Sequence, residues 1–310
     1  MSVLFREEEL YVPKSNWGAM TTQNRGIHYA VEAYVLWGLL PIYWKAIQTL
    51  SAREILSHRV VWSLMVIVIM LSYRKDWKWL QNAITNPVTL ITFLGTACIL
   101  ALNWLTYIWA INSGYIVETS LGYFINPLVN VFLGVIFLRE RPRFWQWIAI
   151  MVAASGVLYL TVGYGVFPWI ALTLASTFGI YGLLRKTASL NALEGLSMEI
   201  GILFLPALAY LLYLEHVGIA SFVHTQILTS ILLPSTGVVT VIPLLLFASA
   251  ARRMTLTTLG LLQYIAPTLQ FLLGVFVYGE ILTKPRMAGF VTIWIALFIY
   301  SIEAIIEGKK

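Results

Sequence analysis

Apolar residues form long continuous runs along this chain, and short polar stretches separate one run from the next. Ten of the runs approach the length of about 20 residues that an α-helix needs to cross the hydrocarbon of a bilayer. Lipid offers the backbone no hydrogen-bond partner, so each run is predicted to be a helix that satisfies its own N–H and C=O groups. The pattern therefore predicts an all-α integral membrane protein with ten transmembrane helices. The predicted spans are near 27–47, 54–73, 88–111, 116–138, 144–162, 166–184, 194–214, 236–251, 256–278 and 287–306.

One region does not follow this pattern. Residues 215–235 hold two shorter apolar stretches, 217–222 and 227–233, which are separated by the polar residues 224–226. Neither stretch alone is long enough to cross a bilayer. We therefore expect a long loop that contains an interfacial helix.

The basic residues indicate how the spans are oriented. With the N-terminus in the cytosol, fifteen of the twenty Lys and Arg residues fall on the cytosolic side, in agreement with the positive-inside rule. Residues 1–25 are polar and lack the apolar centre of a signal peptide, so they are predicted to be a cytosolic tail, as are residues 308–310. The predicted location is the cytoplasmic (inner) membrane, with both termini cytosolic.

Composition agrees with this picture and excludes several classes of function. Hydrophobic residues make up 59% of the chain and charged residues only 11%, whereas soluble proteins carry about 25% charged residues. The chain holds one Asp, Asp76, and one Cys, Cys98, so no disulfide, metal site or cofactor is expected. The net charge is +6, but the basic residues are dispersed at the ends of apolar runs, so the expected partner is the lipid bilayer and not nucleic acid. HExxH, GxSxG and P-loop motifs are absent, which argues against an enzyme and against an ATP-driven pump.

The chain also contains an internal repeat, because residues 101–140 align without a gap to residues 241–280. The two halves, 26–164 and 165–307, would each hold five spans, and this odd number inverts the second half relative to the first. Inverted repeats are common in secondary transporters, where the two halves open a central site to alternate sides of the membrane. A duplication kept only for packing, and a register shifted by two residues, are the alternatives. The nine matched pairs are Leu105/Leu245, Ala110/Ala250, Leu121/Leu261, Ile125/Ile265, Pro127/Pro267, Leu133/Leu273, Gly134/Gly274, Val135/Val275 and Glu140/Glu280.

Several runs of residues resemble one known family. They are Glu54–Ser63, Asn103-Trp104 with Tyr107–Ala110, Glu118–Asn130 (ETSLGYFINPLVN), Tyr181–Lys186, Gln263–Leu273 and Tyr278–Glu280. Together they are similar to RarD-type proteins of the EamA family, in the drug/metabolite transporter superfamily, over nearly all of the chain after residue 25. The resemblance implies ten helices in two inverted five-helix repeats around a central cavity. It also implies transport, often efflux, of amino acids, metabolites or drugs. Glu32 departs from the family pattern, because a small apolar residue is expected at its position.

Polar residues within the spans are costly in hydrocarbon and usually face a cavity or one another. In the fourth span they recur every four residues, which places them on one slowly drifting face, and Pro127 bends the helix within that face. The ninth span repeats the design around Pro267. We expect the two bent helices to form cavity walls, although the same amides could instead join helices by hydrogen bonds. The candidates on these spans are Tyr123, Asn126, Asn130, Gln263, Tyr264 and Gln270.

Other spans supply further candidates for the cavity. Asn103 and Tyr107 share a face of the third span. Trp37 and Tyr181 each precede a Gly-Leu-Leu run at corresponding places in the two halves, and Pro41 suggests a bend in the first span.

Four ionisable residues within the spans are candidates for charge recognition or proton coupling: Glu32, His58, Arg59 and Glu118. For Arg59 we favour an ion pair with Glu54 or Glu118, and a substrate carboxylate or a snorkelling side chain are the alternatives. Two further acids, Glu199 and Glu303, are expected to reach a membrane interface. Glu140 and Glu280, at the ends of corresponding helices, are expected to bind loop amides or else to be solvated.

The function that best fits these features is secondary transport, and export in particular, of a small organic solute by alternating access. A scaffold or receptor without flux is the alternative. Proton coupling and facilitated diffusion both fit the sequence, as do a monomer and a homodimer.

Overall fold

Every secondary-structure element of the described chain is helical. The computed structural model describes residues 22–47, 50–75, 77–113, 115–165, 167–279 and 284–307. The predicted tails and Glu280 lie outside these ranges, except that residues 22–25 form the first turn of the first helix. The elements are α1 (Thr22–Ala46), α2 (Ala52–Arg74), α3 (Lys78–Thr85), α4 (Pro87–Asn112), α5 (Ile116–Phe137), α6 (Phe144–Tyr164), α7 (Trp169–Thr187), α8 (Ala192–Val217), α9 (Ile227–Ala251), α10 (Leu256–Gln263), α11 (Ile265–Leu272), the π-helical turn η2 (Leu273–Val277) and α12 (Lys284–Glu307).

Helices occupy all ten of the predicted segments. Within the part of the chain that the structure describes, seven stretches combine the length and the apolar composition of a membrane span: α2, α4, α5, α6, α8, α9 and the continuous stretch Leu256–Val277. Large apolar side chains are exposed on the outer faces of several of them, for example Val88 at 73%, Leu205 at 71% and Phe276 at 78%. A soluble protein does not expose apolar surface on this scale, so these faces are suited to lipid.

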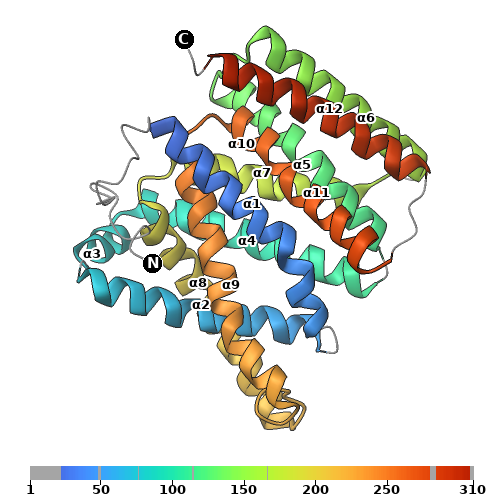
Figure 1. Cartoon of the computed structure of the whole chain (residues 1–310). Helices are drawn as coiled ribbons and strands as arrows, with labels where there is room; N and C mark the ends of the chain where they lie inside the picture. The colour runs from blue at the N-terminus through green and yellow to red at the C-terminus, as the bar shows by residue number, and fades with distance from the viewer. Residues whose placement is uncertain are drawn as a thin grey trace, which may run out of the picture.

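The helices form one bundle in which neighbours in space come from distant parts of the chain (Figure 1). The most extensive contacts join α5 to α7, α6 to α12, α2 to α9, α1 to α9 and α5 to α10. The α6–α12 pair lies along one edge of the bundle, and the α8–α9 hairpin projects from it at the bottom of the view. Helices of both halves of the chain therefore surround the centre.

The prediction for residues 215–235 was wrong in part. A turn occupies only 218–226, and α9 begins directly after it at Ile227 and continues through Pro234 to Ala251. The polar residues 224–226 mark the turn, while Leu233, in the second turn of α9, is fully buried. Tyr43 supports the same stretch by a 2.8 Å hydrogen bond to Ser235. The expected helix is therefore present, but it is the first part of the long helix α9, which packs against α1 and α2, and not a separate interfacial helix in a loop.

Prolines interrupt the backbone hydrogen bonds of two helices that line the centre. Pro267 removes one backbone donor, and the ninth predicted span is divided at Tyr264 into α10 and α11. Pro41 in α1 leaves the carbonyl of Trp37 without its helical partner, and the Gln270 side chain donates a 3.2 Å hydrogen bond to that carbonyl. The freed backbone group is therefore satisfied by a neighbouring helix, as a low-dielectric environment demands.

A close approach between α10 and α5 joins the two halves. A Cβ atom built on Gly260 would lie 2.6 Å from the carbonyl oxygen of Pro127 and 2.9 Å from Cβ of Asn130. Only a glycine fits between the two backbones at this distance.

Candidate functional site

A cavity of about 400 Å³ lies at the centre of the bundle. Residues of α1, α2, α4 and α5 line it from one half of the chain, and residues of α7, α9, α10 and α11 line it from the other. Its volume is within the range of small-molecule sites, roughly 300–1,000 Å³. The sequence candidates that line it are Trp37, Pro41, Arg59, Asn103, Tyr107, Tyr123, Asn126, Gln263, Pro267 and Gln270.

The cavity follows α1 along its second half. Its lining on this helix runs from Tyr34 to Lys45, eleven residues apart, which corresponds to about 16 Å along the helix axis. Near Tyr34, aromatic rings are packed together: the Trp37 ring lies 5.6 Å from both Phe178 and Phe247, and Tyr181 is stacked on Phe247 at 6.2 Å. This aromatic cluster closes the deep end of the cavity, while Lys45 at its other end is exposed.

An amide network connects α5 to α10 at the cavity wall. The side chain of Asn130 donates to Asn126 at 3.2 Å and to Gln263 at 2.8 Å. Asn126 and Gln263 line the cavity, whereas Asn130 lies behind them and is fully buried. Asn103 lines the cavity and donates to α7, at 3.0 Å to the carbonyl of Leu174. The amides therefore join helices and line the cavity at the same time, which combines the two roles that the sequence left open.

Arg59 provides a positive charge in the cavity wall. Its Nε atom donates a 3.0 Å hydrogen bond to Thr240, and its guanidinium carbon lies 4.5 Å from the centroid of the Trp104 ring and 5.1 Å from that of Trp44. Cation–π contacts of this kind favour a guanidinium on an indole face. The second cavity cation, Lys45, lies 3.7 Å from the centroid of the Tyr278 ring.

Arg59 forms neither of the ion pairs that we favoured from the sequence. Glu54 instead accepts two hydrogen bonds from Ser221, at 2.6 Å from its N–H and 2.9 Å from its hydroxyl. Glu118 accepts a 2.9 Å hydrogen bond from the N–H of Ile170, which is one of the unpaired donors at the start of α7. Both acids therefore stabilise the ends of helices and turns.

The remaining candidates lie outside the cavity. Glu32 is on an exposed face of α1. His58 is buried and accepts a 3.1 Å hydrogen bond from Trp62 on the same helix. Tyr264 donates at 3.2 Å to the carbonyl of Phe124 on α5. Pro127 and Tyr181 are also absent from the cavity lining, since Pro127 lies at the α10 contact and Tyr181 in the network described next.

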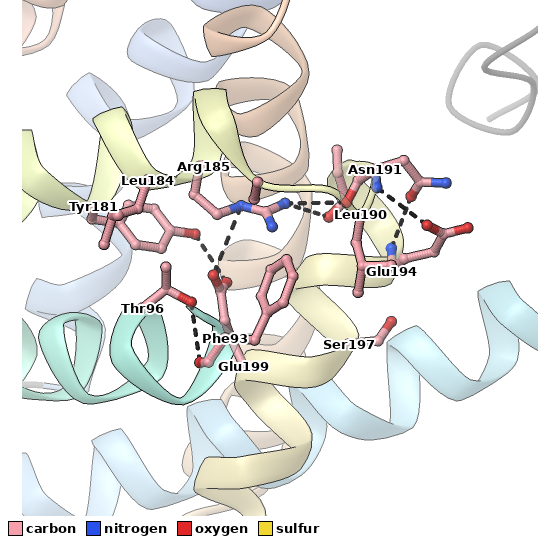
Figure 2. A network of polar contacts seen from close by, with 12 residues as sticks. Phe93, Thr96, Tyr181, Leu184, Arg185, Leu190, Asn191, Glu194, Ser197 and Glu199 are labelled. Atoms are coloured by element: carbon pink, nitrogen blue, oxygen red, sulfur yellow. Dashed lines mark hydrogen bonds and ion pairs between the residues drawn. The ribbon is translucent and has the colours of Figure 1, made fainter. Parts of the chain in front are cut away.

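The structure reveals a buried ionic network that we did not predict (Figure 2). Arg185 at the end of α7 and Glu199 in α8 both have side chains that are 0% exposed, with 3.8 Å between Nε and Oε1. The Tyr181 hydroxyl donates to Glu199 at 3.1 Å, and a terminal nitrogen of Arg185 donates to the carbonyl of Ala192 at 2.8 Å. The prediction that Glu199 reaches a membrane interface was therefore wrong. Glu303 is also buried, and Arg143 donates to it at 2.7 Å.

Other contacts close the same end of the bundle. Glu140 accepts hydrogen bonds from the first two N–H groups of α10, at 2.7 Å from Leu256 and 2.9 Å from Thr257, so its expected bond to neighbouring amides is confirmed. Lys186 donates to the last carbonyls around the α9 terminus, those of Ala251 and Met254. We call this group, with Arg185 and Glu199, the closed end; α1 begins here and the cavity opens where α1 ends.

Fold and cavity together define a multi-pass helical membrane protein with a central solute-sized cavity. Residues 24–162 match the EamA-like transporter family. "Protein RarD" of Streptomyces exfoliatus is 44% identical over 94% of this chain and 93% of its own length. An "Uncharacterized transporter" of Vibrio cholerae is 44% identical over 92% of this chain and 94% of its own. A protein of known crystal structure, with 17% identity, has the same fold at a TM-score of 0.69 over 91% of this chain and 99% of its own.

The two named relatives align with nearly the whole chain, and their identity of 44% establishes common descent. The chain belongs to the RarD-type proteins of the EamA family, within the drug/metabolite transporter superfamily.

Proposed function

We propose that this protein is a secondary transporter, and specifically an exporter, that moves a small organic solute across the cytoplasmic membrane by alternating access. The observation that carries the proposal is the cavity of about 400 Å³ enclosed by helices of both halves of the chain. A solute held between the two halves can be released to either side if the halves exchange their conformations. The family of the chain, whose members include proteins named as transporters, supports the same function.

In this proposal ten helices cross the membrane as two inverted repeats, 26–164 and 165–307, with both termini in the cytosol. The repeat-related positions Tyr123/Gln263 and Asn130/Gln270 support it, because three of these four side chains line the cavity. The closed end would then face the cytosol and the cavity would open to the outside. Alternating access requires the contacts of the closed end to break when the cavity opens to the cytosol.

The three acid–base groups considered for proton coupling do not line the cavity. We therefore assign no role in proton coupling to Glu32, His58 or Glu118. We propose that the solute contacts the polar and aromatic side chains that line the cavity, among them Asn126, Gln263 and Tyr107.

Flux through the purified protein tests the function. Proteoliposomes loaded with a panel of radiolabelled metabolites and antibiotics should show solute-specific exchange that protein-free liposomes lack. Binding of a solute without any flux would favour the receptor alternative and overturn the proposal.

Topology is tested separately by labelling single cysteines in whole cells, in a background where Cys98 is replaced. Cysteines at 139–143 and at 284–286 should be labelled from opposite sides of the membrane. Labelling of both groups from the same side would exclude the inverted arrangement.

A further inference from the structure

Among the described residues, the charged side chains that line the cavity all have the same sign. Among the described residues that line the cavity, Lys45 and Arg59 are cationic and none is an Asp or a Glu. An ionic side chain at membrane depth is expensive, and such groups normally pair with an opposite charge. Among the described residues, the fully buried Arg185 is paired with a carboxylate, whereas Arg59 has no carboxylate partner.

The contacts of the Arg59 guanidinium leave its terminal N–H donors without an acceptor among the described residues. A guanidinium has five N–H donors, of which only the one on Nε, the donor to Thr240, has a hydrogen-bond acceptor among the described residues. The contacts with the Trp44 and Trp104 rings fix the plane of the group. Two parallel donors on a fixed plane match the two oxygens of a carboxylate, which arginine binds in a bidentate manner.

The rest of the wall is suited to an apolar body. Trp37, Phe178, Tyr107 and Tyr123 present aromatic rings to the cavity, and the amides of Asn126 and Gln263 supply isolated polar contacts. No lining carboxylate among the described residues is available for an ammonium group, and Lys45 and Arg59 would repel one. A zwitterionic amino acid is therefore a poorer fit than the corresponding organic acid.

From these observations we propose that the cavity binds organic carboxylates with an aromatic or aliphatic body, and that Arg59 holds the carboxylate group. The inference rests on the proposed function, because it takes the cavity to be the solute site. It narrows the solute class from amino acids, metabolites and drugs in general to monocarboxylate anions that lack a free amine.

Four ligands with the same aromatic body test the charge preference. The full-length protein in nanodiscs is titrated with 3-phenylpropanoate, 3-phenylpropanamide, phenylalanine and phenethylamine, and binding is measured by isothermal titration calorimetry. A ligand that lacks the carboxylate loses the charged hydrogen bonds to Arg59, which corresponds to roughly a 10- to 100-fold higher Kd. We expect 3-phenylpropanoate to bind at least tenfold more tightly than each of the other three ligands. Equal binding of the amide or of phenylalanine, or no binding of the carboxylate, would overturn the inference.

Variants of two arginines on α2 test the assignment to Arg59. Arg59→Gln removes the charge from the cavity, Arg59→Lys keeps the charge but removes the fork, and the exposed Arg53→Gln is the matched control. We expect Arg59→Gln to weaken binding of 3-phenylpropanoate at least tenfold while binding of the amide changes less than twofold, and Arg59→Lys to be intermediate. A monodisperse elution profile and a cooperative thermal unfolding transition show that each variant is folded. An Arg59→Gln affinity equal to that of Arg53→Gln would refute the role of Arg59.

Transport assays separate this inference from the proposed function. Tight, Arg59-dependent binding of the carboxylate without exchange in proteoliposomes would preserve the inference about the ligand and contradict transport. Exchange of amines or neutral solutes that does not depend on Arg59 would preserve transport and contradict the inference.

Discussion

Two arginines inside this bundle illustrate two different ways in which a membrane protein accommodates a charged side chain. At the closed end, Arg185 is sealed: its side chain is 0% exposed, a carboxylate lies 3.8 Å away, and a backbone carbonyl accepts from it. In the cavity, Arg59 lies on indole rings, binds one hydroxyl and has no carboxylate partner among the described residues. Both are contacted by aromatic rings, since Arg185 lies 5.5 Å from the centroid of Phe93. The two sites differ in the source of the carboxylate: Glu199 supplies it to Arg185, whereas a bound solute would supply it to Arg59.

The largest effect on stability is expected from breaking the buried ion pair between Arg185 and Glu199. Glu199→Leu would leave the fully buried Arg185 without its counter-charge, and removal of one partner of a buried ion pair costs about 3–5 kcal/mol. The measurement is the unfolding midpoint of the purified variant, together with its yield from membranes.

The matched control is the double variant Arg185→Leu/Glu199→Leu, which removes both charges at once. Replacing a buried pair by apolar residues is often neutral, so the double variant should recover most of the stability that the single variant loses. If the double variant were as unstable as Glu199→Leu alone, the loss would arise from packing and not from the unpaired charge.

A smaller effect is expected for the other acid of the closed end. The two carboxylate oxygens of Glu140 accept three hydrogen bonds at the start of α10, including 2.8 Å from the hydroxyl of Thr257. Glu140→Ala exposes these donors and removes a negative charge from a helix N-terminus, which together cost about 1–3 kcal/mol. Thermal unfolding measures this loss. Glu215→Ala, which breaks the exposed contact with His224, is the control and should change stability by no more than about 0.5 kcal/mol. Equal effects of the two variants would show that the Glu140 contacts are not formed.

The helices were predictable from the sequence because a bilayer imposes a minimum apolar length, and each of the ten expected segments is helical. The start of α9 was predictable only in part. A short interfacial helix was expected within 215–235, because the apolar stretch 227–233 is too short to span by itself, whereas the structure continues this stretch into the long helix α9, which packs against α1 and α2. Which side chains of a helix face the cavity was predictable only in part. A four-residue spacing drifts around a helix with 3.6 residues per turn. Asn126 therefore lines the cavity while Asn130, on the same predicted face, lies behind it.

Pairings between distant charges could not be read from the sequence for a different reason. Arg185 stands at the end of an apolar run and has the pattern of a basic loop residue, and Glu199 lies near the start of the next run. Both patterns are typical of an interface. Only the packing of α7 against α4 and of α8 against α2 and α4 places the two side chains in the interior. The same limit applies to Arg59, because the two acids expected to pair with it, Glu54 and Glu118, bind other groups.

The smallest effect on stability, and the most informative one for the comparison, is expected for Arg59→Gln in the absence of ligand. An arginine that stabilises the fold through an ion pair would cost several kcal/mol to remove, as predicted for the sealed pair. Arg59 has no such pair among the described residues. Its removal loses one hydrogen bond and two ring contacts but also removes the cost of an unpaired charge at membrane depth, so the net change in the ligand-free free energy of unfolding should be no more than about 1 kcal/mol. At one ligand concentration, 3-phenylpropanoate should raise the unfolding midpoint of the unmodified protein more than that of Arg59→Gln, because the stabilisation grows with the ratio of ligand concentration to Kd. A large loss of stability without ligand would instead make Arg59 a structural residue, and the distinction between the two arginines would disappear.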